Sequence, residues 1–298
     1  MEKRKLGRTG LEVSALGFGG AEIGFEKAEQ AAVDRLLNAA LDAGLNVIDT
    51  AAAYPESEQK IAAAVGSRRG EFFLFTKCGN SMSSDPQYWT ADVLARTIDQ
   101  SLKDLNTDRV DLIQLHSPNV EILKKGEAIE ALQKARAAGK ARFIGCSADN
   151  DAAVYAVECG AFDTLQTSIN IADQSVIDDV LPKAHAAGMG VIAKRPIANA
   201  AWKTGVRPAS PYHHVYWERV QKLRYDFLRQ DLEQSISLAL RFTLSQEGVA
   251  TAIVGTKNPE RWAQNAKLLE SGSLGPQMVE QIRSRWKEAA QSTWVGQT

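Results

Sequence analysis

Two residues near the end of one apolar run could perform acid chemistry together with a third from the next run. The stretch NVIDTAAAY ends its apolar part at Asp49 and reaches Tyr54 shortly afterwards, and FLFTKCG ends the next run at Lys77. A phenol has a pKa near ~10, but a neighbouring ammonium lowers that pKa by about 1–3 units. We therefore expect Asp49 to hold Lys77 as a cation, and Lys77 to lower the pKa of Tyr54 until the phenol works as a general acid.

A fourth residue extends this chemistry. The run DLIQLHSP ends at His116, which can donate a hydrogen bond to a substrate oxygen beside the phenol. Protonating an oxygen while negative charge develops on it is half of a carbonyl reduction, and the other half is a hydride.

The elements that position these residues follow a repeating rhythm. A short apolar run, a polar turn and a longer amphipathic segment recur along the chain, and most runs are unbroken rather than alternating. Such runs are typical of parallel strands covered on both faces. The predicted strands are Ala15–Gly19, Asn46–Thr50, Phe72–Lys77, Val110–His116, Arg142–Ser147, Phe162–Gln166, Gly190–Ala193 and Ala250–Val254.

Helical patterns lie between these runs, and several end at a glycine suited to terminate a helix. The predicted helices are Glu29–Ala43, Ser57–Val65, Thr90–Asp104, Glu127–Ala138, Ile177–Ala187, Leu232–Leu244 and Pro259–Leu269. Two further helices, Val215–Arg229 and Pro276–Ala290, do not fit the repeat. The leading KLGRTGLEV reads as a β-hairpin that closes the barrel floor.

This order predicts an α/β chain folded as one domain over residues 1–298. We expect a (β/α)8 TIM barrel with an N-terminal β-hairpin and two extra helices. The rival is a Rossmann fold, but its glycine fingerprint fails in GFGGAEIG, where Gly17 and Gly19 fit and Glu22 takes the third glycine's place. No P-loop motif occurs.

The totals exclude several functional classes. A formal charge of -1 gives no reason to expect nucleic acid or an anionic membrane as a partner. No apolar run is long enough to span a bilayer, and the charged N-terminus lacks the apolar core of a signal peptide. Three cysteines favour a reducing compartment over disulfide stapling, so we expect a cytoplasmic protein.

Polar groups end seven consecutive predicted strands, and in a barrel these ends form one rim. They are Asp49, Lys77, His116, Ser147, Gln166, the pair Lys194 and Arg195, and the pair Gly255 and Thr256. Any one of them could simply cap a strand, but together they predict one pocket lined with hydrogen-bonding groups.

The chain resembles the aldo-keto reductase superfamily over nearly its whole length. The resemblance lies in GRTGLEVSALGFGG, NVIDTAAAY, FTKCG, SLKDLNTDRVDLIQLH and GTKNPERWAQN, in that order. It implies a (β/α)8 barrel and the catalytic residues Asp49, Tyr54, Lys77 and His116. The implied activity is reversible hydride transfer between a nicotinamide cofactor and an aldehyde, ketone or alcohol, without a metal.

The resemblance also implies cofactor contacts. Ser147 and Gln166 match carboxamide-binding groups, Gly19 and Gly20 match glycines near the nicotinamide, and Asp49 lies beside them. The adenosine end would be held by the segment Gly255, Thr256, Lys257, Arg261, Gln264 and Asn265. Pro259 suits the start of a helix whose N-terminus attracts phosphate, and Lys257 and Arg261 suit an extra 2′-phosphate. We therefore expect NADP(H) rather than NAD(H).

Two positions depart from the family pattern. Ala148 stands where an asparagine is common, which removes one carboxamide hydrogen bond. Lys194 and Arg195 stand where many members carry a stacking tyrosine, and we expect them to reach the pyrophosphate. For the substrate, a small carbonyl compound or sugar, we expect contacts from Tyr54, His116 and Trp89.

Three other functions remain open. The same four catalytic residues serve a sugar or alcohol dehydrogenase that runs mainly in the oxidative direction. Some relatives act as cofactor-sensing regulatory subunits with little turnover. An isomerase or aldolase with Lys77 as a Schiff base ranks last, because Asp49 keeps the lysine charged. The physiological substrate, the reaction direction and the oligomeric state are not determined by the sequence.

Overall fold

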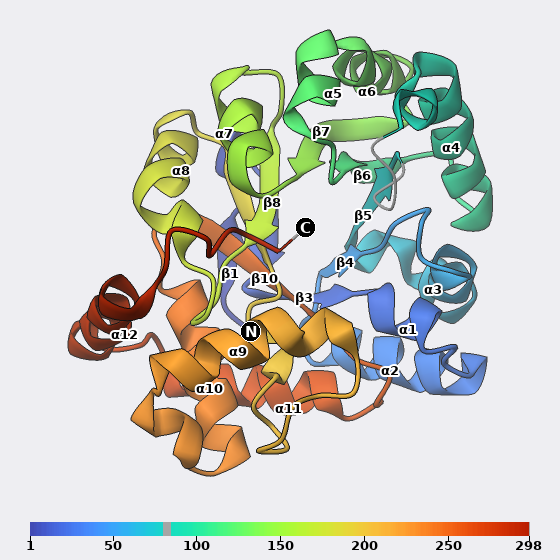
Figure 1. Ribbon diagram of the computed structural model, residues 1–298. Helices are drawn as coiled ribbons and strands as arrows, with labels where there is room; N and C mark the ends of the chain where they lie inside the picture. Colours follow the sequence, from blue (N-terminus) through green and yellow to red (C-terminus); the bar gives the residue numbers. More distant parts are fainter. Residues whose placement is uncertain (80–84, 298) are drawn as a thin grey trace.

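A closed barrel of parallel strands forms the centre of the protein, as predicted (Figure 1). The computed structural model describes residues 1–79 and 85–297. The strand order around the barrel is β10-β3-β4-β5-β6-β7-β8-β9. These strands are β3 Leu16–Gly19, β4 Val47–Asp49, β5 Phe73–Cys78, β6 Val110–His116, β7 Ala141–Ser147, β8 Thr164–Ser168, β9 Gly190–Lys194 and β10 Val249–Gly255. Each strand follows its sequence neighbour around the ring, so the strand ends meet at one rim.

Helices cover the outside of the barrel and bury their apolar faces against the strands. They are α2 Gln30–Asp42, α3 Ser57–Val65, α4 Ala91–Asp104, α6 Glu127–Ala137, α7 Asn150–Glu158, α8 Ser175–Ala186, α10 Leu232–Leu244 and α11 Arg261–Leu268. The short α1 Ala21–Phe25 and α5 Val120–Lys125, together with α7, were not predicted. All three are shorter than ten residues, so each carries little periodic signal.

The two additional helices are present, but the first was predicted too long. α9 spans His214–Leu223 and ends where Arg224 adopts a left-handed φ of 49°. A separate 3-10 turn, Asp226–Arg229, follows it. α12 spans Pro276–Ala289, close to its predicted bounds. Both helices belong to a second apolar cluster beside the barrel, which includes Tyr216 and Trp286.

The N-terminal hairpin closes the end of the barrel opposite the polar rim. β1 Lys3–Lys5 pairs with β2 Glu12–Ser14. Leu6, Leu11 and Val13 are buried among barrel residues that include Phe75 and Ile192. At Gly7, with φ of +49°, an added Cβ atom would lie 2.3 Å from the backbone nitrogen of Gly190. This close approach requires a glycine at position 7. Because the hairpin fills this end of the barrel, the opposite rim is the end where a substrate can bind.

The described residues contain no helix that is both long enough and apolar enough to cross a membrane.

Candidate active site

An ion pair between Asp49 and Lys77 lies at the centre of the rim. Asp49 ends β4 and Lys77 belongs to β5, and the Lys77 Nζ atom lies 2.5 Å from Asp49 Oδ2. The same ammonium donates a hydrogen bond of 2.9 Å to the carbonyl oxygen of Thr50. Both side chains are buried, and a buried charge is costly unless it is paired, so each of the two charges stabilises the other. The predicted contact between the two residues is confirmed.

Tyr54 folds back from the loop after β4 onto this pair. A turn in which the Tyr54 backbone N–H donates to the Ala51 carbonyl, at 2.9 Å, reverses the chain. The Lys77 Nζ atom then lies 5.3 Å from the centre of the Tyr54 ring. The ring meets His116 edge to face, with 5.4 Å between the ring centres. Asp49, Tyr54, Lys77 and His116 therefore form one cluster from three adjacent strands.

The charges in this cluster differ from the predicted ones in one respect. Burial alone would lower the pKa of the Lys77 ammonium, but Asp49 and, after it, Tyr54 raise that pKa above its ordinary value. Lys77 is therefore a cation, as predicted. Burial is also the largest effect on Tyr54 and raises its pKa, whereas Lys77 lowers it by less. The predicted lowering of the Tyr54 pKa is thus wrong, because loss of water outweighs the neighbouring cation.

His116 is neutral at the end of β6. Burial lowers the pKa of its imidazole well below 6.5, and the charges of Lys77, Lys194 and Arg195 lower it further. The Nδ1 atom is buried and makes no hydrogen bond within residues 1–79 and 85–297. A neutral imidazole has one N–H group, so it can donate one hydrogen bond to a substrate oxygen.

The second oxygen of Asp49 faces the inside of the barrel. The side-chain amides of Gln114 on β6 and Gln166 on β8 both donate to Oδ1, at 3.2 and 3.1 Å. Gln166 was predicted to bind the nicotinamide carboxamide, and its amide nitrogen already has an internal partner. Gln114 was not singled out in the sequence, because its position inside the barrel depends on the strand register.

Asp149 is a further site residue that sequence reasoning missed. It follows β7, and its Oδ2 atom lies 2.8 Å from Nζ of Lys194, at the end of β9. Its Oδ1 atom accepts hydrogen bonds from the Ser168 backbone at 2.8 Å and the Thr167 hydroxyl at 3.0 Å. Burial would raise the pKa of this carboxyl, but Lys194 and Arg195 together lower it below its ordinary value. Lys194 and Arg195 already have Asp149 as an internal counter-charge. The predicted contact of these two cations with a pyrophosphate therefore stays a prediction.

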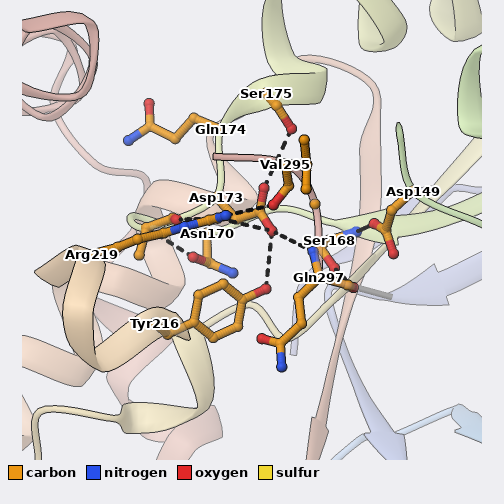
Figure 2. A network of polar contacts seen from close by, with 12 residues as sticks. Asp149, Ser168, Asn170, Asp173, Gln174, Ser175, Tyr216, Arg219, Val295 and Gln297 are labelled. Carbon is orange, nitrogen blue, oxygen red and sulfur yellow. Dashed lines mark hydrogen bonds and ion pairs between the residues drawn. The ribbon is translucent and has the colours of Figure 1, made fainter. Parts of the chain in front are cut away.

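The C-terminal strap, residues 294–297, lies beside Asp149 and Asp173 at the rim (Figure 2). Arg219 donates to the Val295 carbonyl at 2.5 Å, and Arg195 donates to the Gln297 carbonyl. The Gln297 backbone N–H donates to Asp173 at 3.3 Å, so the strap is held mainly through its backbone. Figure 1 accordingly shows the C-terminus over the barrel mouth. Contacts through the backbone leave no side-chain signal in the sequence.

The glycines expected near a nicotinamide have packing reasons of their own. An added Cβ atom would lie 2.7 Å from Ile253 at Gly19, 2.6 Å from Ser57 at Gly20, and 1.6 Å from Glu22 at Gly255. Their predicted cofactor contacts stay predictions.

The segment predicted to hold adenosine is mostly open to solvent. Arg261 and Gln264 are exposed at the start of α11, and the Arg261 side chain makes no hydrogen bond or ion pair within the described parts of the chain. Lys257 pairs with Glu26 at 2.9 Å, and the Thr256 hydroxyl accepts the Asn258 backbone N–H at 3.0 Å. Asn265 is buried. A free guanidinium at a helix N-terminus fits a phosphate group.

Three of the residues predicted to bind the cofactor lie side by side at the rim. Ser147, Gln166 and Lys194 lie on the adjoining strands β7, β8 and β9, beside the catalytic cluster. Trp89, by contrast, is only 3% exposed and packs over Gly79 in the main apolar core. This position favours a packing role for Trp89, and its substrate contact stays a prediction.

Comparison with known proteins agrees with this geometry. The model of the aldo/keto reductase family matches residues 15–287. An L-galactose dehydrogenase of Arabidopsis thaliana is 26% identical over 99% of this chain and 97% of its own length. An uncharacterized oxidoreductase of Bacillus subtilis, YqkF, is 26% identical over 97% of both chains.

Solved structures agree as well. The holo form of the aldo-keto reductase AKR11C1 from Bacillus halodurans superposes with a TM-score of 0.84 and 25% identity, over 98% of this chain and 99% of that one. The chain therefore belongs to the aldo/keto reductase family of oxidoreductases.

Proposed function

We propose that the protein transfers a hydride reversibly between NADP(H) and an aldehyde, ketone or the corresponding alcohol, with Tyr54 as the general acid and base. The observation that carries this proposal is the cluster in which Asp49 holds Lys77 at 2.5 Å and Lys77 lies against the Tyr54 ring beside His116. Its members come from three strands, and they meet only because the barrel brings the strand ends together.

In the reductive direction, the substrate carbonyl oxygen would lie between Tyr54 and His116. The neutral imidazole of His116 donates a hydrogen bond that holds the oxygen. The nicotinamide, when bound, supplies the hydride that goes to the carbonyl carbon. As negative charge develops on the oxygen, the O–H bond of Tyr54 breaks and its proton goes to that oxygen, while Lys77 stabilises the resulting tyrosinate.

The raised pKa of Tyr54 favours this direction at neutral pH. A phenol that stays protonated has its proton available when the alkoxide forms. Oxidation needs the tyrosinate as a base, and that form becomes more abundant as the pH rises. Reduction is therefore expected near neutrality, and oxidation is expected to accelerate in alkaline solution.

The residues that would hold the cofactor lie along the same rim. Ser147 and Gln166 would bind the carboxamide, and Arg261 with the N-terminus of α11 would bind the adenosine phosphate. The free guanidinium of Arg261 supports NADP(H) over NAD(H), because its planar donors match a 2′-phosphate.

A second candidate is a sugar dehydrogenase that works mainly in the oxidative direction. The observation that favours it is the similarity to L-galactose dehydrogenase over nearly the whole chain. The catalytic residues are common to both candidates, so only rates in the two directions separate them.

The test measures NADPH consumption with a panel of aldehydes and NADP+ reduction with a panel of aldoses. Wild type is compared with Tyr54→Phe, which keeps the ring and removes the proton. We expect the variant to lose at least about a hundredfold in kcat, as is typical of a lost general acid. Equal rates for the two proteins would refute the role of Tyr54. Exposed Tyr88→Phe is the matched control and should behave as wild type.

A further inference from the structure

We propose that Gln114 is a positioning residue for the reaction: its side-chain amide fixes the Asp49 carboxylate and so controls how readily Tyr54 releases its proton. This inference rests on the proposed function. Within the described residues, Asp49 is the one member of the catalytic cluster to which the Gln114 side chain is hydrogen-bonded, so Gln114 acts through that carboxylate.

The first support is a polar layer inside the barrel. Asp49, Gln114 and Gln166 come from β4, β6 and β8, which are alternate strands around the ring. In a TIM barrel, alternate strands contribute the side chains of one interior layer, and these side chains are usually branched and apolar. Here hydrogen bonds of 3.2 and 3.1 Å join the three members of the layer at Asp49 Oδ1.

The second support is that the two oxygens of Asp49 have different hydrogen-bond donors. Oδ2 accepts a hydrogen bond from the Lys77 ammonium at 2.5 Å, and Oδ1 accepts one from each side-chain amide of Gln114 and Gln166. Lys77 pairs in register with Gln114 on the neighbouring strand, so the ammonium and the amide approach the carboxylate from adjacent positions. With both oxygens held, the carboxylate has one orientation toward Lys77.

The third support is the space made for the Gln114 side chain. Gly145 on β7 lies beside Gln114 in the strand register. An added Cβ atom at Gly145 would lie 3.1 Å from Gln114 Cγ and 2.2 Å from the Thr164 hydroxyl. The glycine therefore leaves room for the amide to lie inside the barrel.

The fourth support is that burying the Gln114 amide leaves its carbonyl oxygen without a hydrogen bond, an unfavourable arrangement that packing alone does not explain. Gln114 is fully buried, and its Oε1 atom finds no hydrogen-bond partner within the described residues. A methionine of similar length would fill the same space without an unpaired carbonyl. The hydrogen bond that the Gln114 amide nitrogen donates to Asp49 explains why a glutamine stands at this position.

The direction of the effect follows from the charges around Tyr54. After burial, which raises the pKa of Tyr54, the larger effects are those of Lys77, which lowers it, and Asp49, which raises it. Tyr212 raises this pKa and Arg195 lowers it by smaller amounts. The N–H group of Gln114 offsets part of the negative charge of Asp49. Removing that N–H group lets Asp49 act more strongly on the phenol, so the pKa of Tyr54 rises further.

The decisive variant is Gln114→Met, and the measurement is the pH profile of kcat for alcohol oxidation with NADP+. We expect its alkaline-rising limb to move upward by about one pH unit. Because oxidation uses the tyrosinate, this shift lowers kcat at a fixed pH below the limb by about tenfold. Reduction near neutral pH should change less. The affinity for NADPH, measured by tryptophan fluorescence quenching, should stay at the wild-type value.

Thr164→Val is the matched control. Its hydroxyl is buried inside the same barrel and has no hydrogen-bond partner within the described residues, so it is not bonded to Asp49. Its pH profile should coincide with that of wild type. A Gln114→Met profile that coincides with wild type, or a Thr164→Val profile that shifts equally, would overturn the proposal. If Gln114→Met fails to fold, Gly145→Ala, whose added Cβ atom would crowd the Cγ atom of Gln114 at 3.1 Å, must produce the upward shift for the proposal to stand, and the Thr164→Val profile then separates this effect from crowding of the Thr164 hydroxyl.

A second readout separates this inference from the proposed function. The tyrosinate absorbance of wild type minus that of Tyr54→Phe, recorded after a rapid jump to alkaline pH, reports the pKa of Tyr54 without substrate or cofactor. If wild type shows no turnover, the proposed function fails. Even without turnover, the inference is overturned if the Gln114→Met difference titration coincides with that of wild type.

Discussion

The buried carboxylate of Asp149, just after β7, and the partly buried ammonium of Lys194, at the end of β9, form an ion pair 2.8 Å apart at the barrel rim. It is the counterpart of the pair that Asp49 and Lys77 form on the other side of the same mouth. Arg195, next in the chain, lies 3.9 Å from the same Asp149 oxygen. One carboxylate thus lies between two neighbouring cations and offsets part of their positive charge.

Replacing Asp149 by asparagine is expected to destabilise the protein strongly. The change removes the counter-charge of Lys194, whose side chain is 14% exposed. Breaking a fully buried pair costs about 3–5 kcal/mol in the free energy of unfolding, so we expect a loss toward the lower end of that range. Urea denaturation at pH 7 measures this loss. The control is Asp226→Asn, which removes an exposed partner of Arg229 and should cost less than about 1 kcal/mol. A loss below about 1 kcal/mol for Asp149→Asn would contradict the expectation. The double variant Asp149→Asn/Lys194→Met should recover part of the loss.

Asp173 is expected to make the stability of the protein depend on pH. Burial, helped by the negative charge of Asp149, raises its pKa from 3.8 to about 6, although Arg219 and hydrogen bonds from Gln297 and Tyr216 oppose this. Because the folded state binds this proton more tightly, the stability contribution is full below about pH 3.8 and is lost as the pH rises through about 6. The rise in pKa corresponds to about 3 kcal/mol.

Asp173→Asn isolates this contribution, since asparagine resembles the protonated acid. The free energy of unfolding of wild type, minus that of the variant, should fall by about 2.4 kcal/mol between pH 4 and pH 7. Urea denaturation at several pH values measures the difference, and Asp226→Asn again serves as the control. A difference that stays constant over this range would show that Asp173 has an ordinary pKa in the folded protein.

The sequence predicted the barrel well because its strands are unbroken apolar runs bounded by turns. Val110–His116 was predicted with its observed bounds, and the rim residues Asp49, Lys77 and His116 followed from the strand ends. Helix α9 was predicted too long because its apolar pattern continues past Arg224, whose left-handed backbone interrupts the helix without a proline or glycine.

What the sequence could not predict depends on contacts between distant residues. Asp149 and Lys194 are far apart in the chain and meet only through the register of β7, β8 and β9. The pKa of Tyr54 depends on how much water the surrounding loops remove, and the strap is bound through its own backbone. Neither burial nor backbone docking is encoded in the type of a single residue.

Gly296→Ala is expected to displace the C-terminal strap. An added Cβ atom would lie 2.9 Å from Asp149 Cβ and 3.1 Å from Asn150 Oδ1, which also accepts the Gly296 backbone N–H at 2.6 Å. Overpacking of this kind costs about 1–3 kcal/mol. Thermal unfolding measures the loss, and limited proteolysis of the C-terminus measures release of the strap.

Gly66→Ala is the matched control, because its Cβ atom would meet nothing within 4 Å and its backbone is helical. That change should raise the stability by about 0.4–1 kcal/mol, since alanine restricts the unfolded chain. Equal thermal stability of the two variants, with equal resistance of their C-termini to protease, would show that the strap does not rest on Asp149 as described.

Arg261→Ala is expected to weaken NADPH binding and leave NADH binding nearly unchanged. Arg261 is exposed at the start of α11 and free to bind a 2′-phosphate, which NADH lacks. Hydrogen bonds to a charged group contribute about 1.5–3 kcal/mol, so the Kd for NADPH should rise about 10- to 100-fold. Fluorescence quenching with each nucleotide measures both constants, and added salt should weaken NADPH binding more in wild type than in the variant.

Lys267→Ala, in the last turn of the same helix, is the control for a general loss of positive charge. Lys257→Ala should have a smaller effect than Arg261→Ala, because Glu26 already compensates Lys257 at 2.9 Å. If Arg261→Ala weakened the binding of both nucleotides equally, the guanidinium would contact a part that they share, and the preference for NADP(H) would lose its structural basis.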